Sequence, residues 1–343
     1  MSIHLSTRRL ALFTVASLAI LGLVAGPAAG RGGHHEGPPT RGGDKGHIAY
    51  ATFSTADEEG PTTIQVLHES RTRTISTFGS DPRWSPRGNL IAVAGCAAAD
   101  PECAVTIIRR NGQRVRELFQ PSILPTGSTA FTPNVWSPDR RRLAGGVDSS
   151  NADLNGIYLV RSSDGGGPTR VTSNPGGEDI PGSFSPNGRW IVFVRNLLIN
   201  GDLVADGQYA VRTDGSHLHR ITPPETLVNG EHGGRWSPDG RSILFDARPD
   251  EDSRFTLWTI TPNGQQLTRI PIPLKCGAPV TDPTSFGCFA PAWSPDGRRM
   301  VFGTNDAATG ARDLYTVGLT GSALRRVTTL GTETGADVPD WGR

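Results

Sequence analysis

The chain has 343 residues, of which 43 are Gly and 27 are Pro, and this proportion of helix breakers excludes a coiled coil or a helical solenoid. The 34 Lys and Arg residues balance 33 Asp and Glu, so no basic excess favours nucleic acid as a partner. The hydrophobic fraction of 36% suffices for a core of domain size, and we expect a strand-rich globular protein.

The first thirty residues have the layout of a secretory signal. Arg8 and Arg9 precede an uncharged stretch, residues 10–30, which is apolar up to residue 25 and then rich in small residues. We expect cleavage near residues 28–30, and so a secreted protein, extracellular or periplasmic, with no membrane-spanning segment after cleavage. An uncleaved anchor is the alternative, and the arginine pair leaves the export route, general or twin-arginine, open. Residues 31–46, rich in Gly and Arg, are expected to form a flexible linker.

One unit repeats through residues 47–343. An aromatic residue followed by Ser-Pro recurs at Trp84, Trp136, Phe184, Trp236 and Trp293, and Trp341-Gly342 is a clipped sixth copy. In the Ser-Pro-Asp-Gly form of this turn, Ser accepts a hydrogen bond, Pro fixes φ, Asp bonds its own backbone and Gly takes the unusual dihedral. Each copy is therefore predicted to join two antiparallel strands.

Short β-rich segments surround each turn. Second strands are expected at residues 90–94, 143–147, 190–194, 242–245 and 300–303, and third strands at 105–108, 157–160, 209–211, 256–260 and 314–317. A second turn, of Asn-Gly, Asp-Gly or Thr-Gly type, leads to a fourth strand that often ends in Arg-(Ile/Val)-Thr. Four antiparallel strands in a unit of about fifty residues, repeated six times, predict an all-β fold, a six-bladed β-propeller.

The ends of the chain are expected to close the ring. The first unit lacks an initial strand, and residues 338–341 supply a surplus one, which would join residues 48–53, 64–68 and 74–78 in a mixed blade. The aromatic residue of each copy is expected to fill the wedge between neighbouring blades.

These repeats resemble the TolB-like propeller family, whose unit reads roughly P-x-W-S-P-D-G-x-x-I-x-F, then I-Y-V, a D-G turn and R-x-L-T. The resemblance covers essentially everything after Gly46. TolB itself carries an α/β domain ahead of its propeller, whereas here only the linker precedes the first strand, so the resemblance implies the propeller without that domain. It suggests an exported, non-catalytic propeller that binds a protein, a peptide or a cell-envelope ligand, and we expect a monomer.

The four cysteines fit an oxidising compartment. Cys96 and Cys103 flank one loop, and Cys276 and Cys288 bracket an insertion before Trp293. Four cysteines allow three connectivities, of which we expect the local pairing, because each bridge then closes a single loop. A metal site of all four thiolates is the alternative, although no Cys-x-x-Cys spacing occurs.

The candidate binding site is a ring of polar side chains. The sequence has no nucleophile-elbow, zinc-protease or phosphate-binding motif. In propellers of this type the loop that enters each innermost strand faces the mouth of the central channel. These loops carry Asp81, Asn134, Asp179, Glu231 with His232, and Asp337. We expect them to converge on a cation such as Ca²⁺, a sugar or a basic peptide end; alternatively, each carboxylate caps its own turn.

A second function stays open at this point. Related propellers host lyases and hydrolases, and an acidic ring with one His could position a metal and a base. Residues 120–133 and 196–207 are expected to be long loops, which would carry the binding face if the channel mouth does not.

Overall fold

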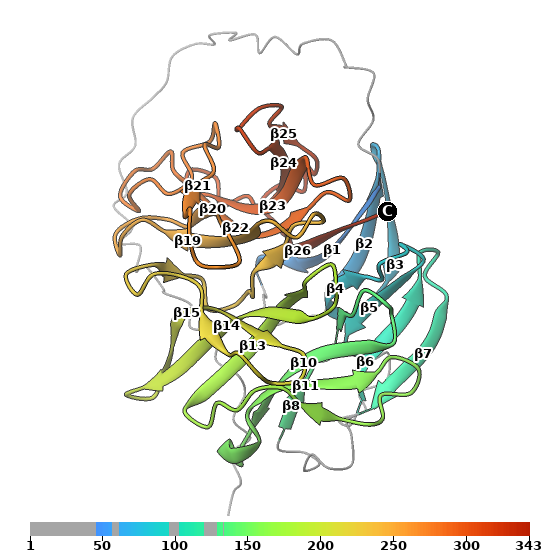
Figure 1. Cartoon of the computed structure of the whole chain (residues 1–343). Helices are drawn as coiled ribbons and strands as arrows, with labels where there is room; N and C mark the ends of the chain where they lie inside the picture. Colours follow the sequence, from blue (N-terminus) through green and yellow to red (C-terminus); the bar gives the residue numbers. More distant parts are fainter. Residues whose placement is uncertain (1–45, 57–61, 96–102, 120–128, 133) are drawn as a thin grey trace, which may run out of the picture. The chain divides into compact units, whose positions relative to one another are not determined.

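The computed structural model describes residues 46–56, 62–95, 103–119, 129–132 and 134–343, which form six antiparallel sheets arranged as the blades of a propeller (Figure 1). The expected signal and linker lie outside these ranges, apart from Gly46. Within them the one helical segment is η1, a short 3-10 turn (Ala152–Leu154), and no helix is long and apolar enough to cross a membrane.

Blades 1 to 3 contain the following strands, from the innermost outward. Blade 1 consists of β26 (Thr334–Gly342), β1 (His47–Ser54), β2 (Thr63–His68) and β3 (Arg71–Ser76). Blade 2 consists of β4 (Ser80–Trp84), β5 (Leu90–Ala94), β6 (Cys103–Arg109) and β7 (Arg114–Phe119). In blade 3 the innermost strand is divided into β8 (Thr129–Phe131) and β9 (Val135–Trp136), followed by β10 (Arg142–Ser149), β11 (Gly156–Arg161) and β12 (Thr169–Arg170).

Blades 4 to 6 complete the ring. Blade 4 consists of β13 (Gly177–Phe184), β14 (Trp190–Ile199), β15 (Asp202–Arg212) and β16 (His219–Arg220). Blade 5 has a divided innermost strand, β17 (Leu227–Val228) and β18 (Arg235–Trp236), followed by β19 (Ile243–Arg248), β20 (Thr256–Ile260) and β21 (Thr268–Arg269). Blade 6 consists of β22 (Phe286–Trp293), β23 (Arg299–Asp306), β24 (Leu314–Gly318) and β25 (Arg325–Arg326). The predicted six-bladed all-β fold is confirmed.

The Ser-Pro turns form through hydrogen bonds between side chains and backbone. In blade 3 the hydroxyl of Ser137 donates to Asp139 Oδ1 (2.7 Å), which also accepts the backbone N–H of Arg141 (3.0 Å). The backbone N–H of Arg142 donates to Ser137 Oγ (2.9 Å), so the turn leads directly into β10. Arg140 stands where the other four copies have Gly and keeps the left-handed φ of 64°, at a cost of about 1 kcal/mol for a residue with a Cβ.

The Thr of each Arg-(Ile/Val)-Thr segment lies just after the short fourth strand, and its side chain accepts a hydrogen bond from a backbone N–H group of the third strand. The hydroxyl oxygens of Thr172, Thr222 and Thr328 accept the backbone N–H groups of Ile157, Gln208 and Leu314 at 2.8, 3.1 and 2.9 Å. These donors would otherwise be buried without a partner. The repeated Thr is therefore explained by the fold.

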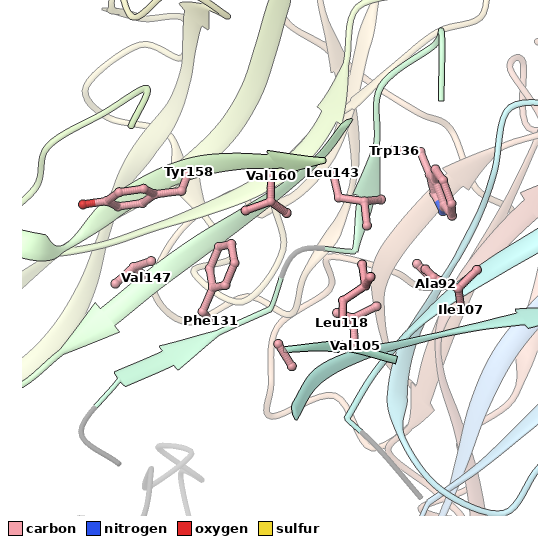
Figure 2. Close-up of a cluster of buried hydrophobic side chains, with 11 residues drawn as sticks. Ala92, Val105, Ile107, Leu118, Phe131, Trp136, Leu143, Val147, Tyr158 and Val160 are labelled. Atoms are coloured by element: carbon pink, nitrogen blue, oxygen red, sulfur yellow. The ribbon is translucent and has the colours of Figure 1, made fainter. Parts of the chain in front are cut away.

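The repeat aromatic residues lie between blades, as predicted. Each of six buried clusters combines residues of two neighbouring blades; five contain one of these aromatic side chains, and the half-buried Trp236 packs against the sixth. Figure 2 shows the cluster between blades 2 and 3, in which Trp136 lies near Ala92 and Ile107 of blade 2. The indole N–H of Trp136 also donates to the backbone oxygen of Arg83 in blade 2 (3.1 Å). Burying each such ring contributes about 2–3 kcal/mol.

The C-terminal strand closes the ring in the predicted way. Strand β26 pairs antiparallel with β1, from His47 opposite Gly342 to Ser54 opposite Thr334, and Figure 1 shows the red strand beside the blue one. Trp341 is buried with Ile48 of blade 1 and Val301 of blade 6. Blade 1 therefore contains residues from both ends of the described chain.

One segment differs from the expected loop. Residues 196–207 extend the hairpin of β14 and β15, with Leu197 opposite Val204 and Ile199 opposite Asp202. The prediction of a loop was wrong because Asn200-Gly201, a preferred hairpin connector, was not recognised as a turn. Of the other expected loop, residues 120–128 and 133 lie outside the described residues, and β8 occupies 129–131.

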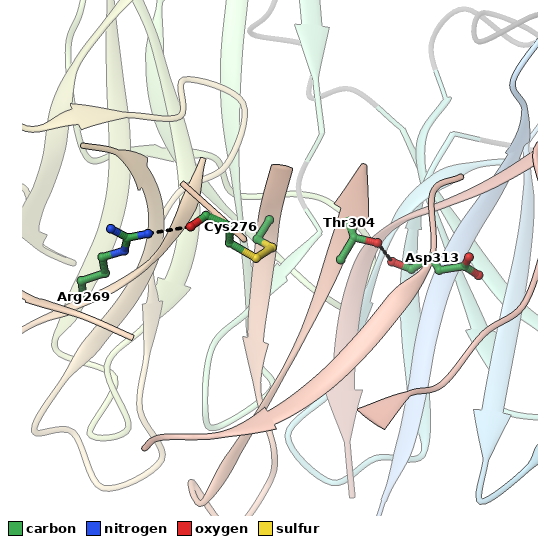
Figure 3. The surroundings of a disulfide bond; sticks show 5 residues. Arg269, Cys276, Thr304 and Asp313 are labelled. Atoms are coloured by element: carbon green, nitrogen blue, oxygen red, sulfur yellow. Dashed lines mark hydrogen bonds between the residues drawn. A yellow bond between two sulfur atoms is a disulfide. The ribbon is translucent and has the colours of Figure 1, made fainter. Parts of the chain in front are cut away.

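The expected bridge between Cys276 and Cys288 is present and buried (Figure 3). The two Cα atoms are 5.6 Å apart, and the guanidinium of Arg269 donates to the backbone oxygen of Cys276 (2.6 Å). The bridge thus ties the long segment between β21 and β22 to strand β22 of blade 6, and the Arg269 hydrogen bond ties the same segment to blade 5. The expected partner of Cys103, Cys96, lies outside the described residues.

We predict that a chain ending at Ala336 melts well below the intact chain. The truncation removes Trp341 and most of the β26 pairing, which exposes a sheet edge and an apolar wedge, and we expect a cost of at least 3–5 kcal/mol, as for the loss of one buried Trp. Thermal denaturation of this variant and of Trp341→Ala measures the effect, with Trp190→Ala as the control for losing an indole outside the repeat position. Equal melting temperatures for the truncated and intact chains would contradict closure by β26.

Candidate functional site

The innermost strands share a bulge three residues before the repeat aromatic residue. Asp81, Ala290 and Val338 occupy this position in β4, β22 and β26 and have φ of 46°, 49° and 47°. Pairing with the second strand shifts register at the same place in β4 and β22. Residues with a Cβ are strained in this conformation, so the fold accepts strain at the inner edge of three blades.

Two of the predicted site regions meet at blades 5 and 1. Between β17 and β18 the chain leaves the sheet, and this loop carries Glu231, which is exposed, and His232. The charge of His232 acts on both Asp246 of β19 and Asp337 of β26. We call Glu231, His232, Asp246 and Asp337 the mouth cluster. Within the described part of the chain, the buried Nδ1 of His232 has no hydrogen-bond partner.

Burial dominates the electrostatics of the mouth cluster. Burial raises the pKa of Asp246 to about 6, although Asn229 Nδ2 donates to its Oδ2 at 2.7 Å. Burial also raises the pKa of Asp337; the charge of Glu231 adds to this rise, whereas His232 and Arg312 oppose it. A carboxylate whose pKa is raised in this way is stabilised by any cation that reaches it.

A second group forms where blades 1, 2 and 3 meet. Arg83 Nη2 lies 2.7 Å from Asp81 Oδ1, and Asn134 Nδ2 of blade 3 donates to Asp81 Oδ2 (2.7 Å). Asp340 of β26 accepts the backbone N–H of Trp84 (2.7 Å), and burial raises its pKa to about 6. Asp81 and Asn134, both predicted, are therefore brought together, and they bind each other across two blades.

Asp179 lies apart from both groups. Its side chain is fully buried and forms a bidentate pair with Arg195, at 2.8 Å from Nε and 2.8 Å from Nη2. Thr172 Oγ1 donates to it at 2.6 Å and Asn174 Nδ2 at 3.1 Å. Both carboxylate oxygens are thus engaged within the fold, by residues of blade 4 and of the segment that leads into it.

The two ends of the ring differ in charge. We call the end at which the chain enters the innermost strands the mouth face, and the opposite end, which carries the Ser-Pro turns, the turn face. The described connections on the mouth face carry the acidic residues Asp153, Glu225, Glu231, Asp250, Glu251, Asp252, Asp282, Asp313 and Glu333, against Arg254, Lys275 and Arg312. The mouth face is therefore acidic although the chain as a whole is nearly neutral.

Neither a metal-binding group nor a pocket coincides with the mouth cluster in the described part of the chain. Among the described residues, no group of three or more His, Cys, Asp or Glu side chains is placed to hold a metal ion. Two surface pockets, of about 280 and 320 Å³, lie between blades 1 and 2 and between blades 5 and 6. Neither pocket is lined by a residue of the mouth cluster.

Three residues of these groups were not predicted from the sequence. Arg83 and Asp340 each stand directly before a repeat Trp. A charged residue at that position of the repeat was the sequence signal that could have identified them. Asp246 interrupts the apolar strand Ile243–Arg248 and is 1% exposed. An ionisable residue inside such a strand indicates a buried charge with a special role.

We predict that Asp246→Asn stabilises the protein at pH 7 more than at pH 4.5. In the folded chain Asp246 titrates at about 6, above its ordinary value of 3.8, so between these values unfolding releases a proton and stability falls as pH rises. The variant does not lose stability in this way. We therefore expect its gain in unfolding free energy over the intact chain to be larger at pH 7 than at pH 4.5, by an amount on the order of 1–3 kcal/mol. Urea unfolding at both pH values measures it; an effect of the same size at both would contradict the raised pKa.

We predict that Asp179→Asn lowers the free energy of unfolding strongly and that Glu231→Gln leaves it nearly unchanged. The first leaves the mostly buried Arg195 without its counter-charge, at a cost of about 3–5 kcal/mol, whereas the second changes an exposed side chain and stays within about 0.5 kcal/mol. Equilibrium unfolding of both single variants tests this. An unchanged Asp179→Asn variant would mean that Asp179 is not needed by the fold and is free for ligand binding.

Comparison with known proteins identifies the fold. No protein-family model matches the chain, and no curated protein matches it. Among solved structures, TolB from Acinetobacter baumannii is 18% identical with a TM-score of 0.63, covering 88% of this chain and 67% of that one. A putative TolB from Agrobacterium tumefaciens is 18% identical with a TM-score of 0.58, covering 87% of this chain and 99% of that one.

A catalytic protein is among the structural neighbours. An oligogalacturonate lyase in complex with manganese is 13% identical with a TM-score of 0.51, covering 79% of this chain and 72% of the lyase. Identities this low indicate a shared fold and leave function to the residues of the site. The chain thus has the fold of a TolB-like six-bladed propeller.

Proposed function

We propose that the chain is an exported, non-catalytic propeller whose mouth face binds a protein segment or another ligand that carries a cationic group. The mouth cluster is the observation that carries this proposal. Two of its carboxylates, Asp246 of blade 5 and Asp337 of the strand that closes blade 1, lie where burial opposes their ionisation. The signal layout expected from the sequence and the disulfide support export.

The electrostatics favour a cation over an anion. Asp246 and Asp337 hold their protons more tightly than free carboxyls do, because no full counter-charge compensates their burial. An ammonium or guanidinium group would offset the uncompensated negative charge of the ionised carboxylates and form charge-assisted hydrogen bonds. The acidic connections around the cluster add a longer-range attraction that speeds the encounter.

Removal of two carboxylates from the cluster tests the proposal. A partner is first captured from a cell-envelope extract on the immobilised chain, identified and purified, and is then titrated against each variant. We expect Glu231→Gln with Asp337→Asn to weaken binding about tenfold, or about 1.4 kcal/mol. The matched control is Asp202→Asn with Glu225→Gln, which removes two exposed carboxylates from the same end of the ring.

The two pairs of substitutions distinguish the outcomes. A selective loss in the first pair supports binding at the mouth cluster. Equal losses in both pairs would indicate attraction by overall charge only, and normal binding by both would place the binding face elsewhere.

A catalytic role is the second candidate, and His232 is the observation that favours it. Its unpartnered Nδ1 lies close enough to Asp246 and Asp337 for their charges to interact, an arrangement suited to a general base. The structural neighbour that is a lyase suggests acidic oligosaccharides as substrates to assay. Cleavage by the intact chain that is lost in His232→Gln, with folding unchanged, would favour the enzyme; no cleavage by either would favour the binding protein.

A further inference from the structure

The turn face carries one exposed arginine from each blade. Four of them follow the turn in consecutive blades, five residues after the repeat aromatic residue. The full set, which we call the arginine ring, is Arg87, Arg141, Arg189, Arg241, Arg298 and Arg343. Apart from Arg343, which follows the closing strand, each belongs to a Ser-Pro turn or directly follows one.

Contacts between successive turns place these arginines on one surface. A Cβ on Gly188 would lie 3.6 Å from Cδ of Pro138, the proline of the preceding blade's turn. The same contact recurs between Gly240 and Pro186 (3.6 Å), and Gly88 lies against the backbone of Arg343. The turns of blades 3, 4 and 5 therefore touch in sequence, the turn of blade 2 touches the residue that follows the closing strand, and their exposed side chains share one face.

The carboxylates of this face do not cancel its positive charge. The described turns of this face carry six carboxylates, equal in number to the arginine ring: Glu69, Asp139, Asp164, Asp214, Asp239 and Asp296. Of these, Asp164 pairs with Arg161 (3.0 Å). The strand ends that flank the turns add Arg109, Arg114, Arg142, Arg161, Arg212 and Arg299. Among the described strands, no end that borders a turn of this face is a carboxylate. The face is therefore basic, opposite to the acidic mouth face.

We propose that the arginine ring docks the propeller on an anionic phospholipid bilayer. Arginine pairs bidentately with phosphate, and each basic side chain near such a surface attracts it independently. Arginines spread around a closed ring of turns can contact a planar array of phosphates together, whereas a single polymer chain would reach only some of them. Docking in this way points the mouth face away from the membrane. The inference does not depend on what the mouth face binds.

Vesicle partitioning tests the proposal with two matched double variants. The purified protein is sedimented with vesicles of phosphatidylcholine containing about one third phosphatidylglycerol, and with vesicles of phosphatidylcholine alone. Arg189→Gln with Arg241→Gln removes two members of the ring from neighbouring blades. Arg248→Gln with Lys275→Gln removes the same charge from the opposite end of the ring. Thermal melting of both variants confirms that they are folded.

We expect binding of the intact chain to the anionic vesicles, weakened by raised salt, and at most weak binding to phosphatidylcholine. The ring variant should partition roughly tenfold less well and the control variant within about twofold of the intact chain. Equal losses in the two variants, equal binding to both kinds of vesicle, or binding to heparin without binding to anionic vesicles would each overturn the proposal.

Discussion

Packing of one aromatic side chain between each pair of blades is the interaction on which the rest of the structure depends. A four-stranded blade has two apolar faces, and each of the six buried clusters draws its members from two blades. No blade therefore has a complete core by itself. The indole N–H of Trp136 and of Trp293 each bonds the backbone of the preceding blade as well, which fixes the angle between the blades.

The repeated turn explains which parts of the fold could be predicted from the sequence. Turn chemistry is local, so the repeat at Trp84 and its equivalents predicted the strands, their order and the closure by residues 338–341, all of which the structure confirms. Residues 196–207, expected as a loop, extend the hairpin of β14 and β15, and Asn200-Gly201 at its tip is a local turn signal of the same kind. Local rules thus sufficed for the fold wherever they were applied.

The candidate site was only partly predictable, because burial there arises from closure of the ring. Asp179 and Asp337 were expected in equivalent loops before a repeat aromatic residue, but both lie within the innermost strands β13 and β26. Asp179 forms an ion pair with Arg195, whereas Asp337 interacts with the charge of His232. Nothing within a single repeat distinguishes them. Arg195 comes from the second strand of the same blade as Asp179, whereas His232 comes from a different blade than Asp337. Only the assembled ring therefore decides which carboxylate has a directly bonded counter-charge.

The pairing of β26 with β1 also sets an order of events in folding. Strands β1, β2 and β3 are synthesised first, but their sheet has an open edge until Thr334–Gly342 arrives from the far end of the sequence. Contacts of such long separation form slowly, and an open edge is a site of wrong pairing while it lasts. Blade 1, whose strands β1 to β3 are synthesised first, is therefore the last blade to be completed. Until β26 pairs with it, its open edge is the part of the incomplete protein most exposed to wrong pairing.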